Sequence, residues 1–210
     1  MKSVGLVVAL FLCGTEAVAA EPPGNAAKTD GIPPTSPLEA TMTLRTTPGF
    51  HAELVASEPM IESPVAISFG PDGKLWVAEM CDYPQGDSSE GGRVKCLHDD
   101  DGDGRYDRSE VFLTGLPLPT GVTAWRGGVL ICAAPDILYA EDTNGDGKAD
   151  KVETLFTGFA THNSQARVNS LEYGLDGWVY GACGLFGGNI TCTKTGKVVL
   201  IYQRDFRIHP

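Results

Sequence analysis

Basic residues are scarce in this chain. Its 210 residues include 16 lysines and arginines against 27 aspartates and glutamates, which gives a formal net charge of −11 at pH 7. This balance argues against nucleic acid as a partner, because phosphates call for a basic surface. The sequence also lacks a C-x-x-C-H motif, so we expect this chain to attach no c-type haem. No stretch keeps a sustained helical period, so strands are expected to build the fold.

Long apolar runs are missing too. Residues 4–12 are apolar but too few to span a bilayer, and nothing later is apolar enough, so we expect no transmembrane segment. Because Lys2 precedes this run and small residues follow at 17–20, residues 1–20 are typical of a secretory signal peptide; a buried N-terminal strand is the alternative. We therefore expect export to the periplasm or the extracellular space. Residues 21–43, rich in proline, alanine, glycine and threonine, are predicted to be a flexible linker before a domain at 44–210.

Five cysteines remain once the predicted signal peptide is removed. Export permits disulfides. Short spacing across expected turns favours the pairs Cys81–Cys96 and Cys183–Cys192, which leaves Cys132 alone. Sequence by itself does not fix this connectivity. Closing a loop of about 15 residues would stabilise the fold by about 3 kcal/mol in the chain-entropy model.

A strand–turn–strand unit recurs along the chain. The segments PVAISFGPDGKLWVAE, TGVTAWRGGVLICAA and RVNSLEYGLDGWVYGAC share a turn glycine, at Gly73, Gly128 and Gly177, so the spacings are 55 and 49 residues. Two more strands are predicted after each of the first two units, at 93–98 and 110–114 and at 137–141 and 151–156. Four antiparallel strands at this period predict an all-β fold of β-propeller blades. With one leading strand at 50–57, we expect an N-terminal fragment holding about three blades of an incomplete ring.

Two acidic loops separate the third and fourth predicted strands of these blades. DDDGDGRYDRSE at 99–110 and DTNGDGKADKVE at 142–153 both match the calcium pattern D-x-[DN]-x-[DN]-G-x5-E. The predicted ligands are the side chains or, at the seventh position, the carbonyls of Asp99, Asp101, Asp103, Arg105 and Glu110, and of Asp142, Asn144, Asp146, Lys148 and Glu153. Solvated Asp-Gly turns are the alternative. A structural calcium is favoured over a catalytic one, because these ligand sets leave little room for substrate.

The opposite end of the strands carries a different set of polar residues. Just before and at the start of an expected inner strand lie His162, Asn163, Gln165, Arg167 and Asn169, with Asp82 and Tyr83 expected to approach from a loop of the first blade. Histidine is well suited to take a proton near neutral pH, and arginine offers a planar fork to carboxylates. A polar turn between blades with a hydrogen-bonded histidine is the alternative reading of these residues.

Several stretches resemble a known family. PGFHAELVASEP, PVAISFGPDGKLWVAEMCDYPQG, GGRVKCLHDDDGDGRYD, HNSQARVNSLEYGLDGWVYGACG and RDFRIHP are similar to the large secreted propeller proteins of planctomycete-type bacteria, described as membrane-bound dehydrogenase domain or PVC-type haem-binding proteins. The resemblance implies a propeller like that of glucose/sorbosone dehydrogenases, which use pyrroloquinoline quinone and calcium. It also implies that a cytochrome c domain follows in full-length relatives.

Residue roles follow from the same resemblance. His162, Arg167 and Asn169 would line the channel, with His162 as the base that removes a proton from a sugar or alcohol. Asn163, Gln165 and Arg167 would hold the cofactor. The function expected first is therefore a quinoprotein-type carbohydrate or alcohol dehydrogenase. A non-catalytic, calcium-stabilised binding propeller for polysaccharide or protein is the first alternative, and a propeller lactonase is the second.

Overall fold

The computed structural model describes residues 6–7, 35–84 and 91–209, and the chain divides into two compact units, Met1–Met60 and Ile61–Pro210. In the first unit, β1 (Leu6–Val7) pairs in parallel with β2 (Ala52–Glu53), and α1 covers Pro37–Thr43. The strand predicted at 50–57 is thus reduced to two residues. Most of the predicted signal peptide, and residues 21–34 of the predicted linker, lie outside the described residues.

Helix α1 corrects the prediction that residues 21–43 form a flexible linker throughout. Its start is held by a capping box, in which the Glu39 backbone N–H donates to Ser36 Oγ at 3.3 Å and the Ser36 N–H donates to Glu39 Oε2 at 3.2 Å. Pro37 at the first helical position is pre-set for helix and lacks only an N–H that would have no partner there. The S-x-x-E spacing was the sequence signal for this helix.

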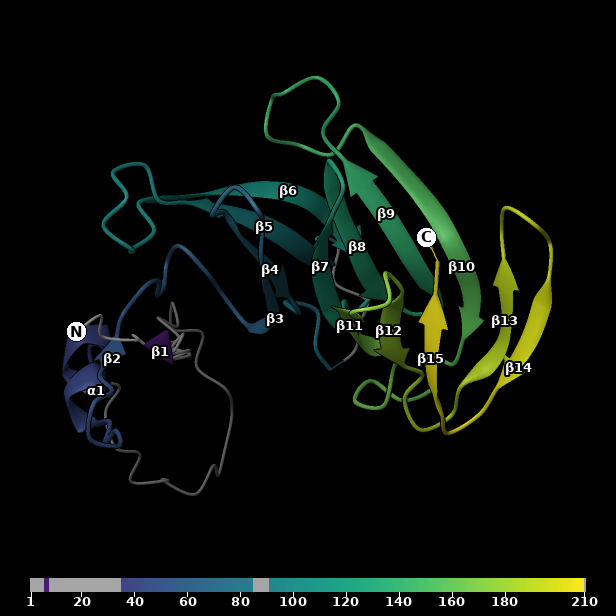
Figure 1. The fold of residues 1–210 in the computed structure, drawn as a ribbon, viewed down its shortest axis with the longest axis horizontal. Coiled ribbons are helices and arrows are strands. Elements are labelled where there is room, and N and C mark those ends of the chain that lie inside the picture. Colours follow the sequence, from purple (N-terminus) through teal and green to yellow (C-terminus); the bar gives the residue numbers. More distant parts are fainter. Residues whose placement is uncertain (1–5, 8–34, 85–90, 210) are drawn as a thin grey trace, which may run out of the picture. The chain divides into compact units, whose positions relative to one another are not determined.

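The second unit begins with a four-stranded antiparallel sheet, which confirms the first predicted blade (Figure 1). The strands follow one another in sequence and in space as β3 (Pro64–Phe69), β4 (Leu75–Glu79), β5 (Gly92–His98) and β6 (Arg108–Leu116). Gly73, at the turn between β3 and β4, has a φ of +82°, a conformation that glycine adopts without steric cost. The Asp-Gly turn signal in the sequence therefore corresponds to a tight hairpin.

The second sheet contains the four strands predicted for the second blade and two more. Its order is β14-β13-β10-β9-β8-β7, built from β7 (Gly121–Trp125), β8 (Gly128–Ala133), β9 (Asp136–Glu141), β10 (Lys151–Phe159), β13 (Gly188–Cys192) and β14 (Val198–Ile201). The third sheet, β11-β12-β15, holds β11 (Asn169–Tyr173), β12 (Val179–Ala182) and β15 (Asp205–Ile208).

The hairpin of β13 and β14 therefore leaves the third blade and extends the second sheet along β10. A Cβ on Gly188 would lie 2.0 Å from the Gly158 carbonyl oxygen, and one on Gly158 would lie 2.2 Å from the Asn189 carbonyl oxygen. The two backbones approach so closely here that only glycine fits at both positions. Instead, β15 adds the third strand of the third blade after the chain returns from this hairpin.

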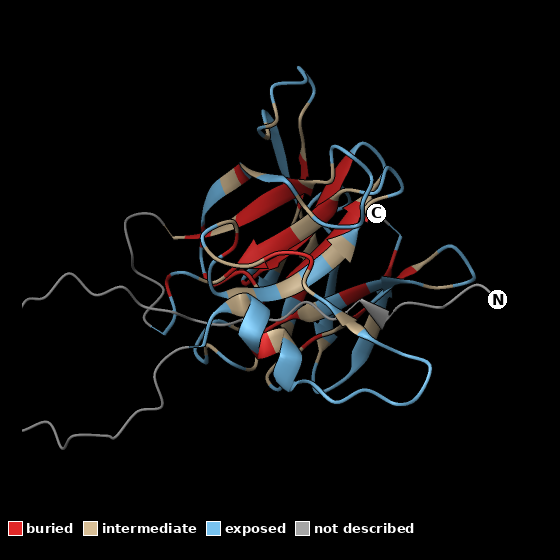
Figure 2. Cartoon of the chain, turned by 90° about the vertical axis from the view of Figure 1, so that its left-hand side faces the viewer, coloured by how far each residue is buried: buried red, intermediate tan, exposed pale blue. Residues whose placement is uncertain are grey.

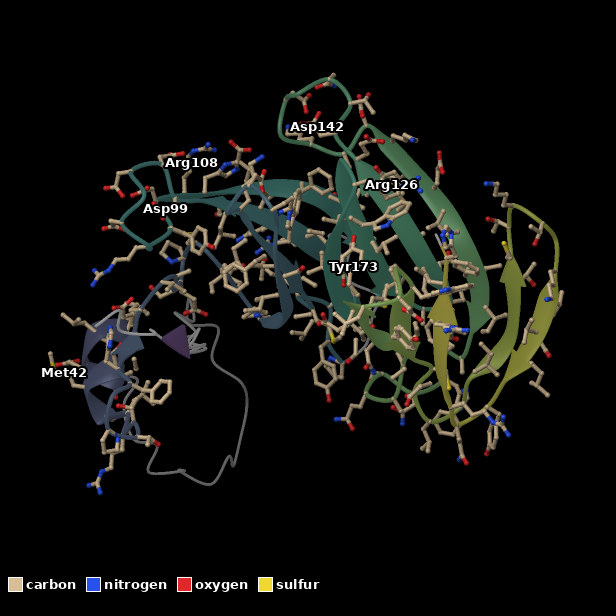
Figure 3. The ribbon with its side chains drawn as sticks, in the orientation of Figure 1. Met42, Asp99, Arg108, Arg126, Asp142 and Tyr173 are labelled. Carbon is tan, nitrogen blue, oxygen red and sulfur yellow. The ribbon has the colours of Figure 1, made fainter. Side chains whose placement is uncertain are left out.

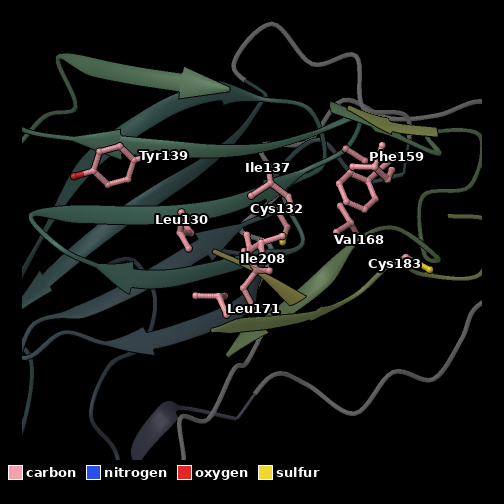
Figure 4. Close-up of a cluster of buried hydrophobic side chains, with 12 residues drawn as sticks. Leu130, Cys132, Ile137, Tyr139, Phe159, Val168, Leu171, Cys183 and Ile208 are labelled. Carbon is pink, nitrogen blue, oxygen red and sulfur yellow. The ribbon is translucent and has the colours of Figure 1, made fainter. Parts of the chain in front are cut away.

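Two apolar clusters hold the three sheets together. Strand β8 is buried on both faces: Val129 and Ile131 pack in the cluster with the first sheet, and Leu130 and Cys132 in the cluster with the third. Figure 4 shows the second of these clusters, and Figure 2 shows that buried residues concentrate on the strands, with exposed loops around them. A sheet covered on both faces is what stacked blades require, so the structure is all-β and propeller-like, without a closed barrel.

Both disulfides predicted from spacing are absent, and the five cysteines of the second unit are free thiols. For the first pair the strand register gives the reason. Cys96 lies opposite Trp76 near one end of the sheet, whereas Cys81 follows the other end of β4. Five residues of extended chain amount to about 16 Å, against the roughly 4.4–6.8 Å between Cα atoms that a disulfide needs. Cys183 is likewise engaged elsewhere, because its Sγ accepts from the Arg204 N–H at 3.2 Å.

We expect thiol mapping to reflect this arrangement. Cys81 is exposed, so alkylation of the native protein should label it, whereas Cys132 is fully buried and burial raises its pKa to about 12. Cys132 should react only after unfolding. Mass spectrometry of non-reduced peptides checks both statements, and recovery of a peptide pair bridged through Cys81 and Cys96 would contradict the structure.

Candidate functional site

The two ends of the strands in the second unit carry different sets of polar residues. Strand β10 starts at Lys151, directly after the second acidic loop, and ends at Phe159, where a loop leads to β11. Eight steps of extended chain separate these points by about 26 Å. We call the side with the acidic loops the acidic end, and residues 160–168 at the opposite end the polar loop. The sequence-based topology, which placed these two sets of residues on opposite faces, agrees with this arrangement.

Arg167 anchors the polar loop from inside. Its guanidinium donates to three backbone carbonyls, those of Thr161 at 2.8 Å, Asn163 at 3.2 Å and Ala134 at 3.4 Å. The residue is 8% exposed, and this burial lowers the pKa of Arg167 from its ordinary value, an effect that the negative charge of Asp82 opposes. The guanidinium thus fixes the path of the loop instead of projecting into solvent.

A segment of the first blade meets the polar loop. Tyr83, just after β4, accepts a hydrogen bond from Gln165 Nε2 at 2.9 Å, so the expected approach of this segment is seen. Asp82 is 4% exposed, and its Oδ2 accepts from the Leu118 N–H at 2.9 Å. Its Oδ1 is buried without a hydrogen-bond partner in the described part of the chain. Asp82 is therefore a buried carboxylate that lies near the cation of Arg167.

His162 is the titratable side chain that the polar loop exposes. Its ring lies against Phe186, with centroids 4.1 Å apart and planes inclined by 59°. Asn163 supports the adjacent turn, because its Oδ1 accepts from the backbone N–H groups of Gln165 at 2.8 Å and Ala166 at 2.9 Å. The loop is therefore held by its own hydrogen bonds while the imidazole remains accessible.

Asn169 was predicted to face the channel together with Arg167. In the structure its Nδ2 donates to the Arg167 carbonyl at 2.8 Å, and its Oδ1 accepts from Ser170 Oγ at 2.7 Å. The five predicted residues thus divide into two groups. His162, Asn163 and Gln165 are on the accessible side of the loop, whereas Arg167 is turned inward and Asn169 is partly buried at the start of β11.

At the acidic end, the first loop gathers three carboxylates. Single oxygens of Asp99, Asp101 and Asp107 all lie within 4.8 Å of one another. Asp99 also orders the turn, since it accepts from the N–H groups of Gly102 at 2.7 Å and Gly104 at 2.9 Å. Hard oxygen donors at this spacing suit a calcium ion. Asp107 occupies the ninth position of the pattern, which the predicted ligand set left out.

Asp103 and Glu110 lie outside this group. Asp103 Oδ1 accepts from the Arg105 N–H at 2.8 Å. Glu110, the predicted ligand at the twelfth position, pairs instead with Arg108, and its Oε2 lies 3.4 Å from His98 Nε2. A Cβ on Gly147 would be 2.4 Å from this same Oε2, so Glu110 reaches the second acidic loop.

The second loop is built around Asp142. Its carboxylate accepts from four backbone N–H groups, those of Asn144, Gly145, Asp146 and Gly147, and these hydrogen bonds lower the pKa of Asp142 from its ordinary value. The turn continues through two further side chains, because Asn144 Oδ1 accepts from Asp146 N at 2.9 Å and Asp146 Oδ1 accepts from Lys148 N at 2.9 Å.

Glu153, predicted at the twelfth position of this second loop, lies 3.6 Å from Lys151 Nζ. Asp99 and Asp142, labelled in Figure 3, lie on loops at the same end of the strands. Both loops therefore present carboxylate oxygens in ordered turns, as a hard cation requires, although neither twelfth residue joins the group at Asp99.

We compared the chain with family models, curated proteins and solved structures. No curated protein matches the chain. A solved structure from Thermus thermophilus, described as a "putative oxidoreductase (glucose dehydrogenase)", has a TM-score of 0.42 and 17% identity, over 58% of this chain and 38% of that one, so the match spans well under half of that protein. Among the described residues, no helix has the length and apolar character needed to cross a membrane. The family model "Domain of unknown function (DUF7133)" matches residues 36–210, and the chain belongs to that family.

Proposed function

We propose that this chain supplies part of an exported propeller dehydrogenase that oxidises a hydroxyl group of a carbohydrate or alcohol. The observation that carries the proposal is His162, an accessible imidazole on a loop held in place by the buried guanidinium of Arg167. A catalytic base needs both access to substrate and a fixed position. Export and a cytochrome c domain that receives the electrons belong to the proposal through the family resemblance.

In this proposal the imidazole of His162 accepts the hydroxyl proton, while the hydride of the same alcohol carbon would pass to a separate acceptor. Phe186 restricts the imidazole, because the two rings are in contact. The hydrogen bond between Gln165 and Tyr83 ties the loop to the first blade, so that the base keeps its place when substrate arrives. Alcohol oxidation also needs a hydride acceptor, which the resemblance gives as pyrroloquinoline quinone.

Arg167, Asn163 and Gln165 were expected to hold the quinone, but their surroundings do not fit that role. An arginine that holds quinone carboxylates must point its donors at them, but Arg167 is 8% exposed and each of its three guanidinium nitrogens donates to a backbone carbonyl. Asn163 and Gln165 are amides that offer hydrogen bonds but no positive charge. Arg167 is therefore assigned to the loop, and the role proposed for this chain's own residues is limited to proton removal by His162.

A dye-reduction assay tests the proposal. The complete protein would be given neutral aldoses and primary alcohols with an artificial electron acceptor, with and without added pyrroloquinoline quinone. The proposal expects substrate-dependent reduction of the dye. A folded protein that reduces no dye under either condition would favour a non-catalytic propeller that binds carbohydrate.

We propose that calcium at the acidic loops stabilises the second unit. With calcium at about 1 mM and an extracellular-type dissociation constant near 0.1 mM, each occupied loop would add about 1.4 kcal/mol to the free energy of unfolding. Thermal melting with calcium and with chelator measures the difference, and Asp99→Asn should reduce it, because Asp99 belongs to the carboxylate group of the first loop. An identical melting temperature in calcium and chelator would contradict the proposal.

A further inference from the structure

A cavity of about 270 Å³ opens at the acidic end, between the first and second sheets. Its walls come from the turn between β3 and β4, from β4, β5 and β6, from the turn between β7 and β8, and from the second acidic loop. The polar loop with His162 is at the opposite end of the strands, so the cavity is separate from the site of the proposed chemistry. It shares Asp142 and Glu110 with the acidic loops, but the chemistry proposed at His162 does not use it.

The charges of the lining come close to cancelling. Carboxylates are supplied by Asp72, Glu110 and Asp142, and cations by Lys74 and Arg126. Lys74 Nζ lies 2.8 Å from Asp72 Oδ2, so this pair is neutral as a unit. An anion would be repelled by the carboxylates, and a cation by Lys74 and Arg126. The balance of donors and acceptors favours a neutral ligand that both donates and accepts hydrogen bonds.

One wall of the cavity is aromatic. Trp76 and Phe112 both line it and pack edge to face, with ring centroids 4.7 Å apart. Arg126, on the rim, stacks its guanidinium 4.0 Å over the ring of Trp125 and is labelled in Figure 3. An apolar wall facing several polar groups is the usual construction of a small-molecule site. It suits a ligand with one C–H face and a polar edge.

His98 lines the cavity with a ring nitrogen that makes no hydrogen bond to the described residues. Its Nε2 is buried and has no hydrogen-bond partner among the described residues, although Glu110 Oε2 lies 3.4 Å away. A polar atom that is buried without a partner costs free energy, which a ligand hydroxyl at this point would recover. The same hydroxyl can donate to Glu110 and accept from His98, so the two side chains together match an alcohol group.

We propose that this cavity binds a single neutral sugar ring. The volume is just below the roughly 300–1,000 Å³ of drug-sized ligand sites, so one ring fits better than a chain of them. The ring's C–H face packs on Trp76, and its hydroxyls bond to His98, Glu110 and Arg126. The inference concerns binding alone and does not depend on turnover at His162.

Isothermal titration calorimetry of the complete chain tests this site. The probes are D-glucose, D-galactose and D-mannose, compared with glucuronate and glucosamine, which carry opposite charges. At least one neutral hexose should bind saturably, and the acidic and basic derivatives should bind more weakly. Arg126→Gly should weaken the binding about 10-fold, because a hydrogen bond to a charged group is lost. Glycine suits this position, since Arg126 has a φ of +52°.

Two variants serve as controls. Arg207→Ala removes another arginine stacked on a tryptophan, because Arg207 on β15 lies 4.6 Å over the ring of Trp178, and the change should alter the dissociation constant less than 2-fold. His162→Ala should also leave it unchanged, whatever its effect on turnover. The proposal is overturned if no neutral hexose binds, if a charged derivative binds more tightly, or if His162→Ala abolishes binding while Arg126→Gly does not. The last result would place the sugar at the polar loop.

Discussion

Replacing His162 with alanine is expected to lower turnover by about 100- to 10,000-fold, the usual span for the loss of a general base. The variant should fold normally, because His162 is exposed and its described ring contact is with Phe186 alone. Steady-state kinetics on the complete protein measures the effect. The loss should fall on kcat, since proton removal is part of the chemical step and not of substrate binding.

A matched control uses another exposed histidine. His51 is exposed, so His51→Ala should leave kcat within about 2-fold of the wild type, as expected for a surface residue. Unchanged kcat in His162→Ala would show that His162 is not the base and would assign proton removal to another residue. An equal fall in both variants would point to a general effect on folding and would count against the assignment of His162.

The second large effect is expected from Arg167→Ala, as a loss of stability. The change leaves three carbonyls without their donor and Asp82 buried without a nearby cation, at a cost of about 3 kcal/mol. Denaturant unfolding measures this free energy. The free energy of unfolding of Arg167→Lys should lie between those of the wild type and Arg167→Ala. Lysine keeps the positive charge but lacks the planar guanidinium that donates to all three carbonyls.

Arg204→Ala is the control for this measurement, because Arg204 is exposed. The free energy of unfolding of Arg204→Ala should stay within about 0.5 kcal/mol of the wild-type value. If Arg167→Ala keeps the stability of the wild type and loses affinity for substrate, Arg167 would be a ligand-binding residue, as the family resemblance implies, and the anchoring role would be wrong.

Local signals predicted the repeating part of the fold well. Asp-Gly and Gly-Gly turns between alternating runs fix both the position and the pairing of neighbouring strands, so the first two blades were predicted strand by strand. The hairpin of β13 and β14 was not, because its pairing with β10 joins residues far apart in sequence. Helix α1 was not predicted, because its seven residues stand in a segment whose composition is typical of a linker, although the S-x-x-E spacing of its capping box is visible in the sequence.

The site was predicted less completely, because burial decides the role of a polar residue. His162 and Arg167 are five residues apart, and nothing in the sequence shows that one is exposed and the other turned inward. The burial of Glu79 could not be predicted from the sequence either. This carboxylate at the end of β4 is fully buried, and its partners include Arg93 on the next strand. The disulfide prediction was wrong for a related reason, since spacing along the chain says little about which end of a strand each cysteine occupies.

We propose that the chemistry takes place at the polar loop and that cation-dependent stability comes from the acidic end. The most direct test of this division is the turnover of the Asp99→Ala variant. It is measured with calcium in the buffer, at a temperature below the melting temperature of the variant, and compared with the turnover of His162→Ala in the same assay. We expect Asp99→Ala to melt at a lower temperature yet keep the wild-type kcat within about 2-fold, because the two sites are separated by the length of the strands. A fall in kcat as large as that of His162→Ala, in folded protein, would contradict the claim.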